Sequence, residues 1–387
     1  MSWLLTADDL PDLARGATLL GTGGGGDPYI GSMLVRRVLG DGAITILDPD
    51  ELPDDLFVIP TAQMGAPTVM VEKIPAGTEP TLALRTLEEH LGRTADATMP
   101  IECGGINSMI PLVVAAETGL PVVDADGMGR AFPELSMETF AVYGVHGSPL
   151  ALAGERGERV VIDTGDDDRQ MEWLARAVTI RLGGVGHIAE YAMTGADVRR
   201  TAVPRTISMA LSLGRAIRLA REEHRSPFEA IADVLATTLY PHVRELCVGK
   251  VVDVERRTTD GFAKGRATIA VPGSDVPLEI AFQNENLVAR RGGETVAIVP
   301  DLICVVDHES AEPVTTEGLR YGQRVRVLGV STPQMMRTPE ALAAFGPAAF
   351  GLDEPFVPVE RGTSVPVERG TGAAPRPPAE EQGGRHA

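Results

Sequence analysis

The pattern of apolar segments changes partway along this chain of 387 residues, and the change limits the possible folds more than any single motif does. Up to about residue 165, short apolar runs typical of buried strands alternate with segments whose apolar residues recur at helical spacing. Strands that alternate with helices favour a mostly parallel sheet covered by helices on both faces. We therefore predict an α/β N-terminal domain with a mostly parallel sheet over residues 1–165.

The second part of the chain has a different pattern. It is mainly helical at first, and from about residue 248 to 330 strand-like runs are separated by Gly-Gly, Pro-Gly and Asp-Gly turns. This pattern predicts an α+β C-terminal domain over residues 166–356 that ends in an antiparallel β module. Residues 357–387 contain a doubled short segment and are rich in Pro, Gly and Glu, so we predict a disordered tail there.

The charge of the chain argues against several classes of partner. Asp and Glu number 54 against 35 Lys and Arg, which gives a net charge of −19 at pH 7. Such a surface repels phosphate backbones and anionic lipids. No apolar stretch reaches the roughly 18 residues that a membrane-spanning helix requires. We therefore expect neither a nucleic acid nor a membrane as partner.

The cysteines and the first residues bear on the compartment. Cys103, Cys247 and Cys304 lie far apart and form no Cys-x-x-Cys motif, so neither a disulfide framework nor a thiolate zinc site is expected. The first residues lack the basic segment and long apolar run of a secretory signal. These features predict a cytoplasmic protein.

A run of glycines follows the first predicted helix and is the most unusual local feature. It reads Gly21-Thr22-Gly23-Gly24-Gly25-Gly26-Asp27-Pro28. A dinucleotide fingerprint needs a strand before the glycines, and a P-loop needs Gly-Lys-Ser/Thr at its end, so neither motif fits. Two readings remain: a plain connection to a second helix capped by Asp27, or a cradle of backbone N–H groups for a ligand carbonyl or carboxylate. In the second reading, the substrate contacts Gly23, Gly24, Gly25, Gly26 and Asp27.

Cys103 lies at the end of a predicted strand and is followed by Gly104-Gly105 and a predicted helix. Ligands bind at the carboxyl ends of strands in open parallel sheets, and a helix N-terminus lowers the pKa of a nearby thiol. These two principles predict that Cys103 is a nucleophile, with the Gly104 and Gly105 N–H groups and the Asn107 side chain as donors to an oxyanion or substrate. The alternative is a small buried hydrophobic residue.

Charged residues nearby supply the remaining candidates. Glu102 could act as general acid or base, although strand alternation turns it to the face opposite Cys103. Asp124 and Asp126 follow the next strand and could ligate a metal, hold a substrate nitrogen or form Asx turns. Arg130 is suited to gripping a substrate carboxylate with two hydrogen bonds. His146 could serve as a base, with a structural role as the alternative.

Four segments of the chain together resemble the S-methyl thiohydantoin desulfurase family. The resemblance covers about residues 8–355, as an N-terminal and a C-terminal family domain, and its motifs are the segments 21–28, 102–107, 124–134 and 283–287. The last of these contains the polar cluster Gln283-Asn284-Glu285-Asn286, which reads either as a tight hairpin or as polar groups that reach a domain interface. The resemblance implies a small-molecule substrate from which the methylthio group of a cyclic amidine-like ring is removed. It also implies a possible hydantoinase-like partner; a homo-oligomer is expected, and neither a cofactor nor a metal is expected.

The resemblance gives the candidate residues a shared reaction. The Cys103 thiolate would attack the ring carbon between two nitrogens, methanethiol would leave, and water would release the hydantoin. Glu102, Asp126 or His146 would transfer protons, and Arg130 would hold a side-chain carboxylate. The glycine run and Asn107 would bind the ring.

Two other functions remain open at this point. One is a metal-dependent cyclic-amide hydrolase that uses Asp124, Asp126, Glu134 and His146. The other is a non-catalytic ligand-binding protein or a partner subunit of a hydantoinase-like complex.

Overall fold

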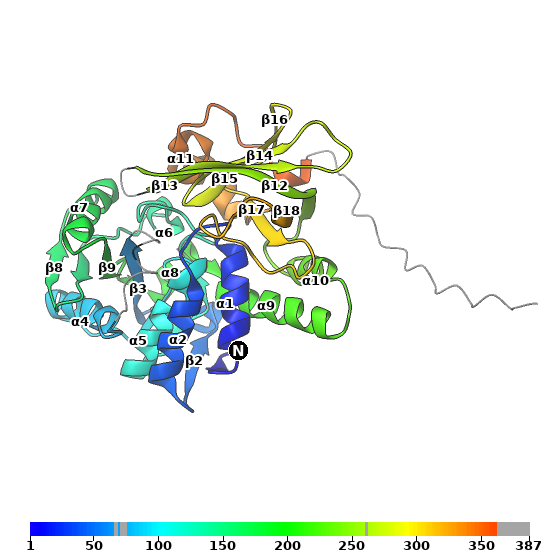
Figure 1. Cartoon of the computed structure of the whole chain (residues 1–387). Helices are drawn as coiled ribbons and strands as arrows, with labels where there is room; N and C mark the ends of the chain where they lie inside the picture. Colours follow the sequence, from blue (N-terminus) through cyan, green and yellow to red (C-terminus); the bar gives the residue numbers. More distant parts are fainter. Residues whose placement is uncertain (66–68, 70–75, 260–261, 362–387) are drawn as a thin grey trace, which may run out of the picture.

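Two sheets organise the chain, of which this computed structural model describes residues 1–65, 69, 76–259 and 262–361 (Figure 1). The first sheet follows the order β1-β2-β5-β4-β3-β9-β7-β8, and β10 pairs with β3. Its central pairs β2–β5, β5–β4 and β4–β3 are parallel, whereas both flanks are antiparallel. The predicted α/β architecture is therefore confirmed, but the sheet is mixed and not mostly parallel. The strands are β1 (Trp3–Thr6), β2 (Ala43–Leu47), β3 (Phe57–Gly65), β4 (Ala97–Met99), β5 (Val122–Val123), β7 (Leu150–Ala153), β8 (Arg159–Ile162), β9 (Val185–Ala189) and β10 (Met193–Thr194).

Helices cover both faces of this sheet. In β7, Ala151 and Ala153 share an apolar cluster with Leu84 of α4, whereas Leu150 and Leu152 belong to the larger cluster that includes α7. Successive strand residues point to opposite faces, so α4 and α7 lie on opposite sides of the sheet. The helices of this part are α1 (Leu10–Leu20), α2 (Pro28–Leu39), α4 (Glu79–Leu91), α5 (Ile110–Thr118), α6 (Thr139–Val142), α7 (Asp168–Arg181), α8 (Gly195–Thr201), α9 (Thr206–Glu222) and α10 (Pro227–Leu235).

The second sheet is antiparallel throughout, as predicted for the β module, and lies across the top of the molecule in Figure 1. Alternate side chains of its strands face an apolar cluster, as the buried–exposed alternation of β14 shows. The strand order is β16-β15-β14-β13-β12-β18-β17. The bounds are β12 (Val243–Thr259), β13 (Phe262–Ala270), β14 (Leu278–Gln283), β15 (Glu285–Arg291), β16 (Glu294–Ile298), β17 (Leu302–Asp307) and β18 (Arg324–Val330).

The first sheet crosses the boundary that the sequence places at residue 165. Strands β9 and β10 come after that residue and yet pair with β3 and β7. Helix α9, which also follows residue 165, packs on α1 near the N-terminus of the chain. The antiparallel sheet begins at Val243, and the part of the chain before it is called the first body below. The acidic turn at residues 165–168 connects two segments of that body.

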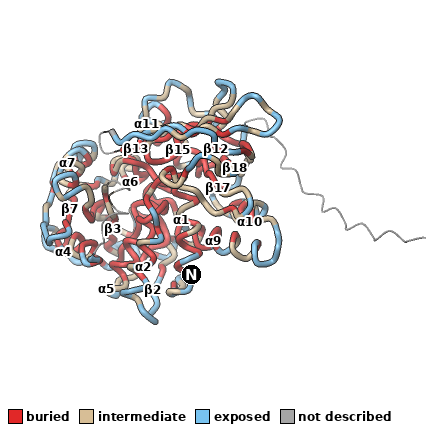
Figure 2. Tube along the Cα trace, viewed as in Figure 1, coloured by how far each residue is buried: buried red, intermediate tan, exposed pale blue. Residues whose placement is uncertain are grey.

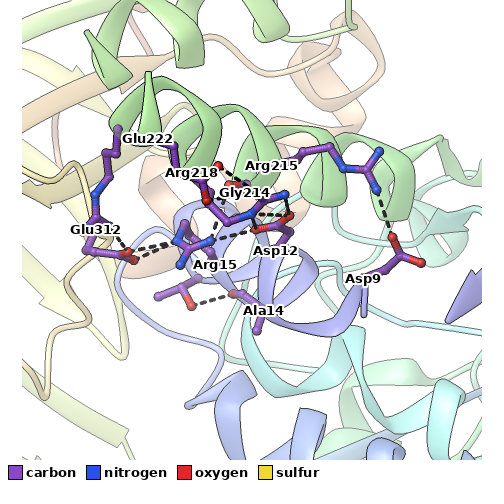
Figure 3. Close-up of polar contacts among 11 residues, drawn as sticks. Asp9, Asp12, Ala14, Arg15, Gly214, Arg215, Arg218, Glu222 and Glu312 are labelled. Atoms are coloured by element: carbon purple, nitrogen blue, oxygen red, sulfur yellow. Dashed lines mark hydrogen bonds and ion pairs between the residues drawn. The ribbon is translucent and has the colours of Figure 1, made fainter. Parts of the chain in front are cut away.

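Helices α1 and α9 cross so closely that glycine is needed at two positions. A Cβ atom at Gly16 would lie 1.7 Å from the Ala210 carbonyl oxygen, and one at Gly214 would lie 1.8 Å from that of Asp12. The Asp12 carboxylate, only 4% exposed, accepts hydrogen bonds from Arg15 and Arg218 at this crossing (Figure 3).

A second bond network extends from the same crossing to the β module. Arg15 of α1 donates to Glu312, which lies between β17 and β18 (Figure 3). Arg221 of α9 donates to the same carboxylate. The two helices therefore connect the first body with the second sheet. Figure 2 shows buried residues along the facing sides of these elements and exposed residues around the rim.

The chain remains packed beyond the predicted start of the tail. Val359 is 1% exposed and donates its backbone N–H to Asp301, and Glu360 pairs with Arg337. The predicted start of the disordered tail at residue 357 is therefore too early, because the chain is packed up to residue 360. The rest of that prediction concerns residues 362–387, which lie outside the described residues. Among the described helices, none is long and apolar enough to cross a membrane.

Candidate active site

A hollow with about 60 Å³ of space for water-sized molecules lies where the first sheet, the glycine run and the second sheet meet. Its lining comes from segments far apart in the sequence. They include the glycine run, the end of β3, the loop after β4, the loop after β6 (Ala125–Asp126) and the start of β15. The polar lining residues are Gln63, Glu102, Asn107, Glu134, Arg176, Asn284 and Glu285.

The glycine run and the loop after β4 touch through their backbones. The Ile106 N–H donates to the Gly25 carbonyl oxygen over 2.9 Å. A Cβ atom at Gly25 would lie 2.6 Å from the Gly104 oxygen, and one at Gly105 would lie 2.1 Å from the Gly25 oxygen. Gly105 also has a φ of +68°, which favours glycine. The glycines therefore allow two loops to approach each other, and Gly25 and Gly26 also line the hollow.

Glu102 faces this hollow and is buried. Its Oε1 accepts a 2.7 Å hydrogen bond from Asn107 Nδ2, and Oε2 makes no hydrogen bond with any described residue. Burial, together with the nearby Glu285 carboxyl, raises the pKa of Glu102 well above its usual value, and the Asn107 donor acts in the opposite direction. Burial thus favours the protonated form of Glu102, while the Phe132 backbone, like Asn107, favours the ionised form.

Asn107 holds Glu102 in place. Its Oδ1 accepts the Gln63 backbone N–H over 2.7 Å, and Nδ2 donates to the Gln63 carbonyl oxygen over 3.1 Å. Because a backbone N–H can only donate, Oδ1 must face Gln63, and Nδ2 is left to face Glu102. The side chain expected to bind a substrate is thus committed to the protein.

Glu285 is the second carboxyl of the hollow. It follows Asn284, whose φ of +58° turns the chain into β15. Its Oε1 accepts the Gly25 N–H over 3.3 Å, and Oε2 makes no hydrogen bond with a described residue. Burial raises the pKa of Glu285 to about 8, against the opposing charge of Arg130. One signal in the sequence pointed to this residue, namely its place in a polar cluster between apolar strands.

Cys103 does not line the hollow. It is 0% exposed and belongs to the main apolar cluster, whereas its neighbour Glu102 lines the hollow. Strand β4 ends at Met99, so both residues lie in the loop after it and not at the predicted strand end. Burial, and next the Asp126 carboxyl, raise the pKa of the Cys103 thiol well above its usual value. The expected lowering is therefore wrong. The turn that follows is a four-residue 3-10 helix, Gly105–Ser108, and α5 begins only at Ile110.

The acidic residues after β5 serve local structure. Asp126 Oδ1 accepts the N–H groups of Met128 and Gly129, and burial raises its pKa to about 6. Asp124 accepts the Ser208 N–H in the first turn of α9. Of the three roles considered for Asp126, these hydrogen bonds fit an Asx turn best.

His146 lies away from the hollow. It is exposed and its Nδ1 lies 3.1 Å from Asp168, at the start of α7. The four residues proposed as metal ligands therefore do not share one set of contacts. They are Asp124, Asp126, Glu134 and His146. Among the described residues, no group of three His, Cys, Asp or Glu side chains could hold a metal ion.

Arg130 is fully buried and bonded only to backbone oxygens. Its guanidinium donates to the carbonyl oxygens of Ala131, Asn286, Pro300 and Asp301. Burial lowers the pKa of Arg130 to about 10. The expected carboxylate grip is therefore wrong, and this side chain fixes the loop after β6 to the second sheet.

The other residues of the glycine run have structural contacts. The Gly23 carbonyl accepts hydrogen bonds from Thr316, and a Cβ atom at Gly24 would lie 2.1 Å from Glu285 Oε1. Asp27 is exposed and caps α2 by accepting the Tyr29 N–H. The helix-cap reading of Asp27 is confirmed, and Asp27 does not line the hollow.

Family models match nearly the whole described chain. Residues 8–164 match the model described as S-Me-THD-like, N-terminal domain, and residues 166–359 match S-Me-THD-like, C-terminal domain. A crystal structure of a protein from Chromobacterium violaceum is similar, with 26% sequence identity and a TM-score of 0.77 over 92% of this chain and 100% of that one. Among curated proteins, none matches.

Proposed function

Because the chain belongs to the S-Me-THD-like family, we propose that its hollow binds an S-methyl thiohydantoin-like ring and removes the methylthio group by hydrolysis. The observation that carries this proposal is the pair Glu102 and Glu285. Each carboxyl is buried, each has one oxygen held by a protein donor, and each leaves the other oxygen without a hydrogen bond to a described residue. Buried carboxyls with raised pKa values are suited to acid–base catalysis near neutral pH.

The reaction needs one acid and one base. The acid protonates the ring nitrogen that is double-bonded to C2, and the base takes a proton from water as the oxygen bonds to C2. The C2–S bond then breaks, and the sulfur takes the proton held by the base to leave as methanethiol. The C2 hydroxyl returns its proton to the acid as the carbonyl forms. One water is consumed, and methanethiol and a hydantoin are released.

The surroundings of the two carboxyls distinguish their roles. Glu285 has the opposing charge of Arg130 and the Gly25 N–H, both of which favour its ionised form. Glu102 lies beside the other carboxyl and keeps its proton more strongly. We therefore assign the acid to Glu102 and the base to Glu285.

A covalent mechanism through Cys103 is the second candidate for this substrate class. It requires the thiol to leave the apolar cluster and reach the hollow, and it requires a thiolate that burial disfavours. A role as a partner subunit of a hydantoinase-like complex is a further alternative, and it predicts binding of a ring without turnover.

A methanethiol-release assay tests the proposal. S-methyl thiohydantoins and the corresponding hydantoins are offered to the wild-type protein and to Glu285→Gln. We expect release from the S-methyl compounds, and a loss of at least about 100-fold in Glu285→Gln, as is typical for removing a general base. Absence of release from every compound by the folded wild type would contradict the proposed reaction and favour the partner-subunit role.

A further inference from the structure

A second depression, with about 880 Å³ of space for water-sized molecules, adjoins the hollow. Glu134 and Arg176 line both spaces, so the two lie on either side of these side chains. The walls of this groove come from α7, from Phe262 at the start of β13, from α11 (Pro339–Phe345) and from the 3-10 helix η4 (Pro347–Phe350). The groove therefore lies at the surface next to the hollow, between the first body and the C-terminal helices.

One side of this groove is apolar. Trp173 is 69% exposed and Ile180 is 59% exposed, and both lie on one face of α7 together with Ala177. The other apolar lining residues are Met137, Phe262, Ala343, Ala344, Ala348 and Ala349, and the polar ones are Glu134, Ser136, Arg169, Glu172 and Arg176. Large apolar side chains gathered in an exposed depression are typical of a ligand-binding surface.

Arg176 forms a fixed wall between the hollow and the groove. Its guanidinium donates to Glu172 and to the Pro133 carbonyl oxygen, and it lies 4.5 Å from the centre of the Phe262 ring. Its charge is thus paired within the protein. A ligand can therefore pack against the flat guanidinium of Arg176 without supplying an anionic group to pair with it.

We propose that this groove accepts an apolar substituent, aromatic or branched aliphatic, carried by C5 of the substrate ring. The inference rests on the proposed function, because a ring bound in the hollow is what places the substituent beside the adjoining groove. A ring held at Glu102 and Glu285 would extend its substituent past Arg176 toward Trp173. The preferred substrate class is therefore S-methyl thiohydantoins with a large apolar C5 group.

Two substrates that differ only at C5 test this inference, one with hydrogen and one with a benzyl group. We expect the wild type to have a kcat/KM at least about 10-fold higher for the benzyl compound, in the range that buried apolar groups supply. Trp173→Ala and the groove-filling Ala343→Trp should each remove most of this preference and leave turnover of the unsubstituted compound within about twofold. Tyr321→Ala, which removes another exposed aromatic side chain, is the matched control.

A binding measurement separates failure of this inference from failure of the proposed reaction. Calorimetry with 5-benzylhydantoin and unsubstituted hydantoin needs no turnover, and we expect tighter binding of the benzyl compound that is lost in Trp173→Ala. Equal binding of both compounds by the wild type, or an unchanged preference in both groove variants, would overturn the inference. A change in oligomeric state in Trp173→Ala without a change in preference would overturn it too, in favour of an interface with a second copy.

Discussion

At the scale of single residues, the neighbours Glu102 and Cys103 show how differently two adjacent side chains of one loop can be placed. Both follow the end of β4 at Met99, yet the carboxyl lines the hollow and the thiol joins the apolar cluster. The sequence predicts Cys103 as the reactive group of this loop, whereas the mechanism proposed above assigns that role to Glu102. The helix N-terminus that was expected to activate the thiol is displaced by a 3-10 turn, and burial dominates the pKa of Cys103.

Asn107 gives a prediction at this scale. In Asn107→Ala, Glu102 loses the donor that fixes its orientation and favours its ionised form, so its pKa should rise further and kcat should fall at least about 10-fold. The pH dependence of kcat distinguishes this positioning role from a structural one, because the limb that belongs to Glu102 should move to higher pH. Ser108→Ala, which removes a hydrogen bond within the same turn, should leave the profile unmoved.

Glu285 gives a prediction about stability. Its pKa in the folded chain, about 8, exceeds the usual value for a glutamate, so the folded state binds the proton more tightly than the unfolded state does. A raised pKa means that this group supports folding fully at acid pH and that its contribution is lost as the pH rises through about 8. Glu285→Gln should therefore raise Tm at pH 9 relative to wild type and change it less at pH 5. A lower Tm of the variant at pH 9 would contradict this reading.

At the scale of secondary-structure elements, the alternation of strands and helices and the antiparallel module were predictable because both leave periodic apolar patterns. The end of the first sheet was not, since β9 and β10 return to it after the chain has passed through α7. Glu285 was out of reach for a similar reason. It comes from the second sheet, and only the packing of that sheet on the glycine run brings it to Glu102.

The crossing of α1 and α9 gives a prediction at the element scale. A methyl group at Gly214 would meet the Asp12 carbonyl oxygen at 1.8 Å, so Gly214→Ala must push the two helices apart. Overpacking of this kind typically costs about 1–3 kcal/mol of unfolding free energy, which urea unfolding would detect. Ser212→Ala, on the exposed side of the same helix, is the control. Equal stability of Gly214→Ala and wild type would mean that the crossing is looser than described.

At the scale of the whole molecule, the site exists only where two distant parts of the chain meet. The first body supplies Glu102 and Asn107, and the second sheet supplies Glu285. The Arg130 bonds to carbonyl oxygens and the Glu312 network hold these parts together. The motifs of the family are spread over both parts of the chain. The family could be inferred from the sequence because each motif is a short continuous segment that is recognisable without the fold.

The end of the chain gives a prediction at this scale. Val359 is buried and Glu360 pairs with Arg337, so a chain that ends at residue 356 should have a lower Tm than one that ends at residue 361. The sequence predicts that removal of residues 362–387 leaves Tm unchanged. Thermal unfolding of the two truncated chains beside the full-length protein measures both effects. Equal Tm values for all three would contradict the packing role of residues 357–361.

The most direct test of the account compares the two neighbours in the loop after β4. Methanethiol release from one S-methyl thiohydantoin is measured with wild type, Glu102→Gln and Cys103→Ser, after circular dichroism has established that all three are folded. The account predicts a loss of at least about 100-fold in Glu102→Gln and less than about 10-fold in Cys103→Ser. The reverse order, with the thiol variant inactive and the carboxyl variant active, would contradict the account and establish the covalent mechanism.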